Sequence, residues 1–476
     1  MTAPAQRLPG ATRRAILVLM AVELFSSLEQ GLLYPAMATI AREYGGMDRV
    51  TWLISIFSLV QAATVALGAR LGDLFGRRRL MMIILLLAGF GSLLSALSSQ
   101  LAVIIAGRGI QGVSAALLPL CFGIARDIVP RERLTVMIGL LAGMYSASGA
   151  LGYALGGWMT EAFGWHSIFY LTVFLPVVTI PLVLAFLPAD KPAGGRTRLD
   201  LPGAFLLVPG IVALLLAITY LRQWPFWMLG AAVLAAAGFV AVWARHESRL
   251  EQPLIDVRLL RHRGVAMANT ISLLIGMGLS TMPLVVLAMI QQPAWTGVGL
   301  GVSATLAGFL KMPANLNSAI IGPFAGWLAD RTSLRFVTVF GTLLGIFGWS
   351  LLLVWQSPLW LVILAAVIIS ANTSFLLAAL PSVVLSIAPP DRSSEAAGML
   401  SLSRGIGTAL GAQIAGLLLS LSFVTGADGA RFADTDAYRA AYIYAAVCAT
   451  VCLAACLALP RKQARARGRA GTGALP

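Results

Sequence analysis

Residues 71–79, Leu-Gly-Asp-Leu-Phe-Gly-Arg-Arg-Arg, form a short polar stretch between two long apolar runs. A related stretch at residues 326–331, Gly-Trp-Leu-Ala-Asp-Arg, also stands between two apolar runs. Each places an aspartate at the end of an apolar run, with arginine close behind. The carboxylate can then pair with arginines or with the free amides at a neighbouring helix N-terminus. Two copies in matching places predict a duplicated helical bundle whose halves face each other.

The composition predicts an all-α integral membrane protein. Of the 476 residues, 59% are hydrophobic and only 11% are charged, about half the charged fraction of a soluble domain. A helix needs roughly 20 apolar residues to cross a bilayer, and it hydrogen-bonds its own backbone there. Fourteen apolar segments meet this description, at about 15–40, 50–72, 80–98, 101–128, 134–161, 166–189, 201–221, 223–244, 264–290, 299–329, 334–355, 358–387, 393–423 and 438–460.

The net charge of +15 is distributed in a way that orients the chain in a membrane. With the N-terminus inside, 26 of the 34 Lys and Arg residues fall on the side of both termini, five on the opposite side and three within apolar segments. This asymmetry follows the positive-inside rule and predicts cytoplasmic termini on a multi-pass protein of the cell inner membrane. The basic tail is interpreted as a topology anchor near anionic lipid, and no nucleic-acid partner is expected.

A second internal match divides the chain into regions. Leu380-Pro381 and residues 387–392 echo Leu118-Pro119 and residues 128–133, which pairs the fourth segment with the twelfth. The predicted regions are a cytoplasmic tail at 1–14, an N-terminal six-helix bundle at 15–189, a loop with two extra membrane helices at 190–244, an amphipathic cytoplasmic linker at 245–263, a C-terminal six-helix bundle at 264–460 and a basic tail at 461–476. The extra pair lacks polar residues at membrane depth, so it is interpreted as a lipid-facing spacer outside the transport path. The outer loop at 424–437 is polar and is expected to be mobile.

Four charged residues at membrane depth are the candidate functional residues. A carboxylate at the centre of a membrane helix costs about 2.5–3.5 kcal/mol on insertion scales, so Glu23 and Glu29 should face a cavity or a partner. They lie six positions apart, about 120° around a helix, and Glu29 has the more polar neighbours. Arg108 is flanked by glycines, and two interpretations stay open: charge relay with a carboxylate, or packing through bonds to backbone carbonyls. Lys311 precedes a helix-kinking proline, and it could snorkel, pair with Glu23 or Glu29, or hold an acidic substrate.

The remaining candidate residues fall into three groups. The predicted substrate cavity is lined by Glu29, Gln30, Arg108, Gln111, Lys311, Asn315 and Asn372. The predicted conformational latch consists of Asp73, Gly76, Arg77, Arg78, Asp330 and Arg331. The predicted helix-packing glycines are Gly149, Gly152, Gly156 and Gly157. Cys121, Cys448, Cys452 and Cys456 are interpreted as small packing residues, with no disulfide framework and no metal site expected.

These motifs resemble the fourteen-helix drug:proton antiporter branch of the major facilitator superfamily. The signature loop of that family matches Leu71, Gly72, Asp73, Gly76, Arg77 and Arg78, with departures at Ala69 and Leu74. Its Arg-x-x-Gln-Gly sequence matches Arg108, Gln111 and Gly112, its first-helix acid falls on Glu29, and its linker resembles residues 253–260. The resemblance implies two six-helix bundles with two extra helices between them. Tyr153 stands where the family's antiporter motif has proline, and the first-helix proline is shifted to Pro35.

The expected function is secondary active transport, as proton-coupled efflux of small amphipathic compounds by alternating access. Glu29, Glu23 and Arg108 are the expected proton-coupling residues. The alternatives are a proton-coupled importer or uniporter of a small organic solute, and a lipid translocator. No enzymatic activity is expected, because His166, His246 and His262 are scattered among loops and segment ends. The expected partners are a small-molecule substrate, protons and membrane lipid, with no cofactor and a monomeric state.

Overall fold

The computed structural model describes residues 10–190, 201–250, 257–385, 393–427 and 429–459. The chain tails, part of the predicted linker and the repeat at 387–392 lie outside these ranges. The backbone is described at Asp73 and Asp330, but their side chains are not.

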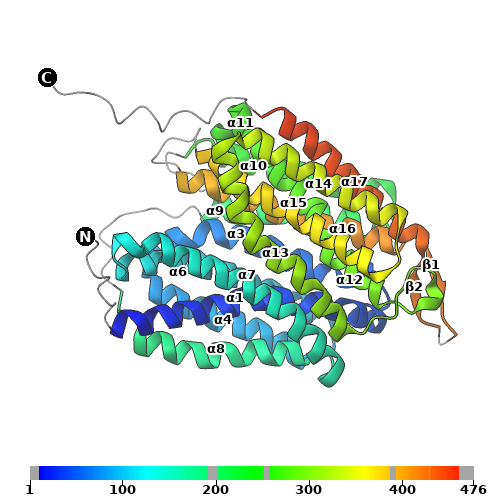
Figure 1. The fold of residues 1–476 in the computed structure, drawn as a ribbon, viewed down its shortest axis with the longest axis horizontal. Helices are drawn as coiled ribbons and strands as arrows, with labels where there is room; N and C mark the ends of the chain where they lie inside the picture. The colour runs from blue at the N-terminus through cyan, green and yellow to red at the C-terminus, as the bar shows by residue number, and fades with distance from the viewer. Residues whose placement is uncertain (1–9, 191–200, 251–256, 386–392, 428, 460–476) are drawn as a thin grey trace.

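The chain is built from long helices (Figure 1). The first part contains α1 (Gly10–Tyr44), α2 (Met47–Val50), α3 (Trp52–Phe75), α4 (Arg77–Leu97), α5 (Leu101–Gln111), η1 (Gly112–Ala116), α6 (Leu117–Ile128), α7 (Arg131–Phe163) and α8 (Ser167–Phe186). Next come α9 (Leu201–Thr219), α10 (Phe226–Glu247) and η2 (Val257–Arg261). The last part contains α11 (Arg263–Met277), η3 (Leu279–Thr281), α12 (Met282–Gln291), η4 (Ala294–Thr296), α13 (Ala304–Arg331), α14 (Leu334–Val354), α15 (Leu359–Leu385), α16 (Ser393–Leu419), β1 (Phe423–Thr425), β2 (Arg431–Ala433) and α17 (Thr435–Leu457).

Helix packing divides these elements into two bundles and an inserted pair. In the N-terminal bundle, α1 packs on α7 and α8, and α4 packs on α5 and α8. In the C-terminal bundle, α11 packs on α16 and α17, and α14 packs on α15 and α17. The inserted helices α9 and α10 pack on each other, and α9 also contacts α16. Figure 1 shows the two bundles side by side, with α1 and α17 pointing their free ends to one end of the molecule and the β1–β2 hairpin at the other. We call these the terminus end and the hairpin end.

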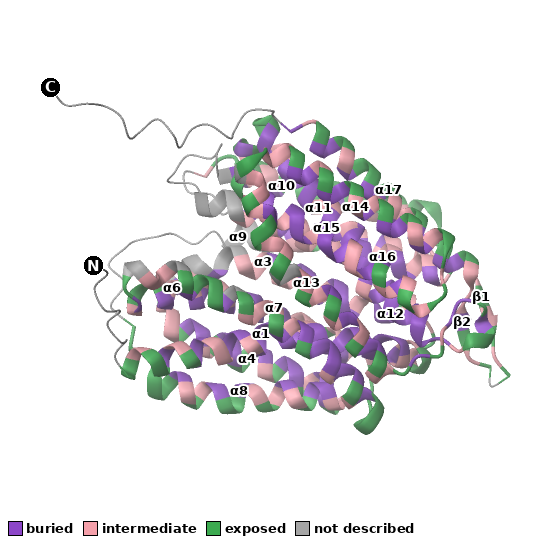
Figure 2. Cartoon of the chain, in the orientation of Figure 1, coloured by how far each residue is buried: buried purple, intermediate pink, exposed green. Residues whose placement is uncertain are grey.

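Eleven helical stretches of the described chain are long and apolar enough to cross a membrane. Figure 2 shows exposed residues along their outer faces. Many of the exposed side chains are large and apolar, including Phe226 (93% exposed) and Leu234 (74% exposed). A water-soluble surface rarely carries so many, whereas lipid is the natural solvent for them. The protein is therefore a multi-pass membrane protein.

Two apolar runs that read as single helices are interrupted by 3₁₀ turns. The run at 101–128 divides into α5, η1 and α6, and the run from Arg263 to Gln291 divides into α11, η3 and α12. At the first break, a Cβ on Gly112 would lie 2.7 Å from the carbonyl oxygen of Phe57 on α3. Short 3₁₀ stretches inside helices are common where function needs a bend, and this one lies beside the buried charges described below.

The polar loop at 424–437 contains a small antiparallel hairpin. Strands β1 and β2 pair with Val424 opposite Phe432. Asp434 ties the hairpin to α17, because its carboxylate accepts hydrogen bonds from Ser422 Oγ and Ala437 N. Burial raises the pKa of Asp434, but these hydrogen bonds outweigh burial and hold the pKa below its ordinary value. The strands have only three residues each, too few for an alternating pattern to be visible in the sequence.

Candidate functional site

The two bundles meet closely near the hairpin end and separate toward the terminus end. On α7, a Cβ at Gly157 would overlap the carbonyl oxygen of Ala304 on α13. On α13, a Cβ at Gly308 would overlap the carbonyl oxygen of Tyr153. Nearer the terminus end the same two helices diverge. Four glycines there have open space where a side chain would begin. Within the described chain, a Cβ added at any of them would have no atom of another element within 4 Å. They are Gly139 and Gly143 on α7, and Gly322 and Gly326 on α13.

The other predicted packing glycines lie against α1 inside the N-terminal bundle. A Cβ at Gly152 would lie 2.8 Å from the carbonyl oxygen of Leu28, and one at Gly156 would overlap that of Leu32. Gly149 faces Ser27. Thus α7 carries two glycine faces, one toward α1 and one, at Gly157, toward the C-terminal bundle. Close backbone approach of this kind is the usual way in which membrane helices associate.

The second seam between the bundles joins α3 to α16 and includes the inserted pair. Ser55 Oγ donates to the carbonyl oxygen of Ala409 at 2.9 Å. At the hairpin end, Gln413 Oε1 of α16 accepts from Thr51 Oγ1 and from Thr219 Oγ1, each at 3.2 Å. Trp52 Nε1 donates to the same Thr219 hydroxyl at 3.0 Å. The inserted pair is therefore more than a spacer at one point, because Thr219 at the end of α9 contacts both bundles. Helix α10 is largely exposed, as a lipid-facing helix would be.

A pocket of about 190 Å³ lies where the bundles begin to separate. Its lining consists of Ser27, Gln30, Gly31, Tyr145, Ser146, Gly149 and Tyr153 from the N-terminal bundle and Asn315 from the C-terminal bundle. Tyr145 Oη donates to Gln30 Oε1 at 3.4 Å. Of the predicted cavity residues, Gln30 and Asn315 belong to this lining.

Lys311 lies next to this pocket and is 5% exposed. Its ammonium donates to Asn315 Oδ1 at 3.1 Å and sits 5.5 Å from the ring centroid of Tyr153. The Tyr153 ring in turn stacks on Tyr34. Lys311 does not pair with Glu23 or Glu29 among the described contacts, and its burial leaves no room to snorkel. The groups that stabilise its ammonium are an aromatic ring face and an amide oxygen, and these interactions are weaker than an ion pair.

Glu29 and Arg108 lie together inside the N-terminal bundle. Glu29 is 2% exposed, and neither carboxylate oxygen accepts a hydrogen bond in the described structure. Its polar neighbours are Ser114 and Ser92, and the charge that acts on it is the Arg108 guanidinium. Arg108 is 2% exposed, and the two side chains are too far apart for an ion pair within the described chain.

Arg108 is held by three groups of its own bundle. It donates to the carbonyl oxygen of Leu53 at 3.2 Å and to Gln111 Oε1 at 2.9 Å, and it lies 4.2 Å from the Phe57 ring centroid. Gln111 Nε2 in turn donates to Ser92 Oγ at 2.6 Å, which extends the hydrogen-bond network to α4. Both interpretations of this arginine therefore have a physical basis, because it bonds a backbone carbonyl and also acts on a carboxylate.

Two other predicted residues lie away from the pocket. Glu23 is fully buried next to Cys121, on a different face of α1 from Glu29, and its carboxylate accepts no hydrogen bond in the described structure. Asn372 is also fully buried, and its Nδ2 donates to the carbonyl oxygen of Gly341 at 2.6 Å. That contact joins α15 to α14 inside the C-terminal bundle.

The predicted latch residues lie at the terminus end. Gly76 turns the chain between α3 and α4 with a φ of +91°. Arg77 pairs with Asp127 on α6 at 2.7 Å, and the backbone amides of Arg78 and Arg79 donate to Asp190. These contacts lie within the N-terminal bundle, as expected where the bundles are apart. Arg331 stacks on Trp327 at 4.3 Å.

The comparisons with known proteins agree with this architecture. The model of the Major Facilitator Superfamily matches residues 19–310 and 270–475. The chain belongs to this superfamily. It is therefore a membrane transporter of small molecules and not an enzyme.

Related transporters differ in what their names say they act on. The methyl viologen resistance protein SmvA of Salmonella typhimurium is 28% identical over 421 residues, which cover 86% of this chain and 82% of that protein. Multidrug resistance protein 3 of Bacillus subtilis is 25% identical over 416 residues, covering 86% and 79%. The riboflavin transporter RibZ of Clostridioides difficile is 26% identical over 407 residues, covering 83% and 86%.

Solved structures share the fold. An auto-inhibited POT family peptide transporter has a TM-score of 0.66 at 15% identity, covering 94% of this chain and 97% of that one. A mutant form of the nucleoside transporter NupG has a TM-score of 0.64 at 13% identity, covering 93% and 99%. At these identities the likeness concerns the fold alone.

Three tyrosines at the site were not among the predicted residues. Tyr34, Tyr145 and Tyr153 stand between the buried charges and the bundle interface. One signal was present in the sequence, since Tyr153 replaces a proline of the resembled branch. In the structure the Lys311 ammonium lies 5.5 Å from the Tyr153 ring centroid.

Proposed function

We propose that this transporter exports small amphipathic compounds in exchange for protons. The names of the multidrug and methyl viologen resistance relatives support export of toxic compounds. The exchange mechanism is supported by a buried carboxylate, Glu29, that accepts no hydrogen bond within the described chain and has one cation near it. This observation carries the proposal.

The physical reason is the cost of an ionised carboxylate in a dry interior. Without hydrogen bonds, a buried carboxylate is far more costly when ionised than when protonated. Arg108 lowers that cost for the ionised form. A shift in the distance between Glu29 and Arg108 during the cycle would therefore bind or release a proton. Glu23 has no such cation near it and is the second candidate.

The proposed topology has fourteen crossings and cytoplasmic termini in the cell inner membrane. Eleven of the crossings are the apolar stretches described above, and helices α3, α9 and α13 supply the other three. The excess of Lys and Arg at the terminus end supports the orientation. In this orientation the separated ends of the bundles face the cytoplasm. Substrate would enter between α7 and α13, meet Gln30, Asn315 and Lys311, and leave after the hairpin end opens.

The latch is proposed to act in the opposite state. When the terminus end closes, Asp73 and Asp330, with Gly76, Arg77, Arg78 and Arg331 beside them, would come within reach of helix ends of the other bundle. Carboxylates and arginines at helix ends make such contacts favourable and reversible.

A second function, import of a small organic solute, is favoured by one observation. Tyr153 occupies the position at which the resembled antiporters have proline, and the riboflavin transporter is a relative of similar identity. Import would use the same pockets and the same charges, so only the direction of transport separates the two proposals.

Everted membrane vesicles test the function and its direction together. An efflux-deficient strain that expresses the protein is first screened for growth against a panel of toxic compounds. A compound against which the protein protects the cells is then added to everted vesicles whose interior is more acidic than the medium. We expect accumulation inside the vesicles that stops when an ionophore collapses the proton gradient. Accumulation that is unchanged when the proton gradient is collapsed would reject proton exchange. Loss of preloaded compound from the vesicles would indicate import.

A further inference from the structure

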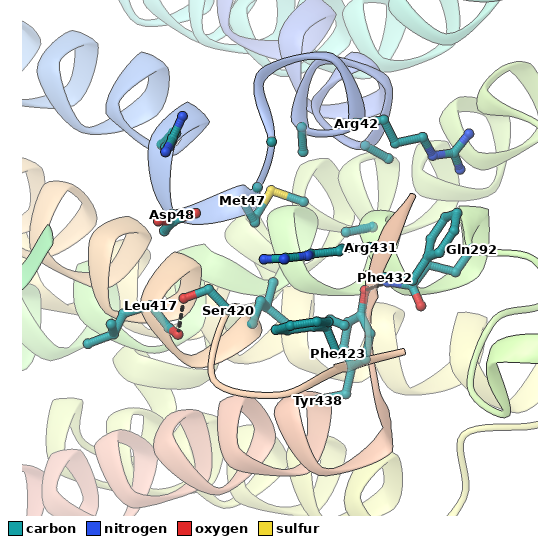
Figure 3. Close-up of a pocket in the computed structure, with 18 of the residues that line it drawn as sticks. Arg42, Met47, Asp48, Gln292, Leu417, Ser420, Phe423, Arg431, Phe432 and Tyr438 are labelled. Atoms are coloured by element: carbon teal, nitrogen blue, oxygen red, sulfur yellow. Dashed lines mark hydrogen bonds between the residues drawn. The ribbon is translucent and has the colours of Figure 1, made fainter. Parts of the chain in front are cut away.

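A second pocket, of about 340 Å³, opens at the hairpin end (Figure 3). Its walls come from the end of α1, from α2, from the turn between α9 and α10, from the end of α16 and from the hairpin. It is separate from the pocket beside Lys311, with which it shares no lining residue. Both bundles and the inserted pair contribute to it.

The walls carry a strong excess of positive charge. Four arginines line the pocket, Arg42, Arg49, Arg222 and Arg431, and the lining contains one carboxylate, that of Asp48. Arg42 at the end of α1 and Arg49 on α2 lie close in sequence, whereas Arg222 and Arg431 come from distant parts of the chain. In the described chain, none of their guanidinium groups forms an ion pair. The positive charge of this cluster is therefore not neutralised by a carboxylate of the described chain.

Two of the arginines are held in place by aromatic rings. The guanidinium of Arg431 lies 4.5 Å from the Phe423 ring centroid, and that of Arg42 lies 5.4 Å from Phe432. Figure 3 shows Arg431 extending across the pocket above Phe423. Arg42 also donates to the carbonyl oxygen of Gln291 at 3.4 Å. The stacked guanidinium of Arg431 keeps its N–H edge free, and that edge matches carboxylate and phosphate oxygens. Arg49 and Arg222 have no hydrogen bond or ring contact within the described structure.

The oxygen of a buried amide at the pocket also lacks a hydrogen-bond partner in the described chain. Gln292 lines the pocket, is 8% exposed and donates from Nε2 to Tyr438 Oη at 2.9 Å. Its Oε1 has no hydrogen-bond partner within the described chain. The tyrosine hydroxyl can donate as well as accept, so the amide can turn either edge toward a ligand. A buried polar atom without a partner is costly, and a bound polar group would remove that cost.

We infer that this pocket binds an organic anion. The acidic group, a carboxylate, phosphate or sulfonate, lies among the four guanidinium groups. The apolar body of the ligand packs on Phe423, Phe432 and Tyr438, and Gln292 bonds a polar atom of the ligand. A free metabolite and an anionic lipid headgroup share this chemistry.

Binding of an anion has a consequence for the conformation. The arginines come from the N-terminal bundle, the inserted pair and the hairpin, so they repel one another when the hairpin end is closed. A bound anion screens this repulsion and favours the closed form. All four side chains are exposed, so water and salt compete with the ligand.

Calorimetric titration of the purified full chain in neutral-lipid nanodiscs tests this site without any transport assay. The probe is naphthalene-2-carboxylate, and its uncharged control is naphthalene-2-carboxamide. We expect saturable binding of the carboxylate, weaker at high salt, and no binding of the carboxamide at the same concentrations. Arg222→Gln and Arg431→Gln should each weaken binding about two- to five-fold, as expected for exposed charge pairs. The double variant should weaken it roughly tenfold if the two act independently.

Arg439→Gln is the matched control. Arg439 lies at the same end, faces Asp436 at 3.7 Å and does not line the pocket. It should keep the wild-type affinity. Equal binding of the carboxamide, unchanged affinity in the double variant, or an equal loss in Arg439→Gln would each overturn the inference. All the substituted arginines are exposed, and a size-exclusion profile identical to wild type checks that the variants fold.

Nanodiscs that contain phosphatidylglycerol separate the two sources of anion. If a headgroup fills the site, these nanodiscs should weaken carboxylate binding to wild type, and the double variant should lose this sensitivity. If the ligand is a free anion, the affinity should be the same in both nanodiscs. A titration of this kind can succeed even if the proposed proton exchange fails, so the two proposals are tested separately.

Discussion

Replacing Glu29 by glutamine should reduce proton-driven transport about a hundredfold or more, the equivalent of a few kcal/mol at roughly 1.4 kcal/mol per tenfold. Glutamine keeps the size of the side chain and mimics the protonated acid, but it cannot release a proton. The protein should therefore still bind and exchange substrate. The measurement is transport in proteoliposomes, compared under a proton gradient and in substrate counterflow, where no net proton movement is needed.

Glu23→Gln tests the second candidate in the same assays. Glu23 lies on the same helix and is equally buried, but its neighbour is Cys121 and no cation acts on it. We expect it to retain most of the proton-driven activity. If Glu29→Gln kept full proton-driven transport, or lost counterflow to the same degree, Glu29 would not be the proton-binding residue.

Gly308→Val should have the second large effect, through the contact between the bundles. A Cβ at this position would overlap the backbone of Tyr153 on α7, and a backbone cannot move aside as a flexible side chain can. Overpacking typically costs about 1–3 kcal/mol. The hairpin end could then close only at that cost, which shifts the balance between the two states by roughly ten- to a hundredfold. Transport should fall by a similar factor.

Each bundle keeps its own packing in this variant, so the protein should fold. Gly322→Val lies on the same helix α13, where a Cβ meets no described atom of another element. It should transport normally, and Gly308→Ala should fall between the two. Normal transport by Gly308→Val would contradict the tight seam, and an equal loss in Gly322→Val would mean that α13 itself is sensitive to any added side chain.

The sequence was sufficient for the membrane class, the family and the buried charges, because each depends on local composition. Apolar runs separated by basic loops predict spanning helices, and Glu29, Arg108 and Lys311 stand out because charge at membrane depth is expensive. The superfamily is confirmed by the family match. The antiporter branch and the proton-coupling roles remain predictions.

Contacts between distant residues could not be predicted in the same way. Arg42, Arg222 and Arg431 are three of the five basic residues on the side opposite the termini, and nothing in one sequence indicates that they converge on one pocket. Thr219 looked ordinary in an apolar helix, yet it joins Trp52 to Gln413. The division of the run at 101–128 into α5, η1 and α6 depends on the close approach of α3, a tertiary effect that local pattern does not carry.

The central claim is that the two bundles close at one end while they open at the other. Pulsed electron–electron double resonance measures this directly, because it gives the distance between two spin labels attached to cysteines. One pair, Gly139→Cys and Gly322→Cys, stands at the terminus end, where a Cβ meets no described atom of another element at either site. The other pair, Phe163→Cys and Trp295→Cys, stands at the hairpin end on side chains that are 67% and 56% exposed. The four native cysteines are buried, so the new ones label selectively. The account predicts that substrate or a change of pH shortens the first distance and lengthens the second in the same sample. Two distances that stay constant, or that change in the same direction, would contradict it.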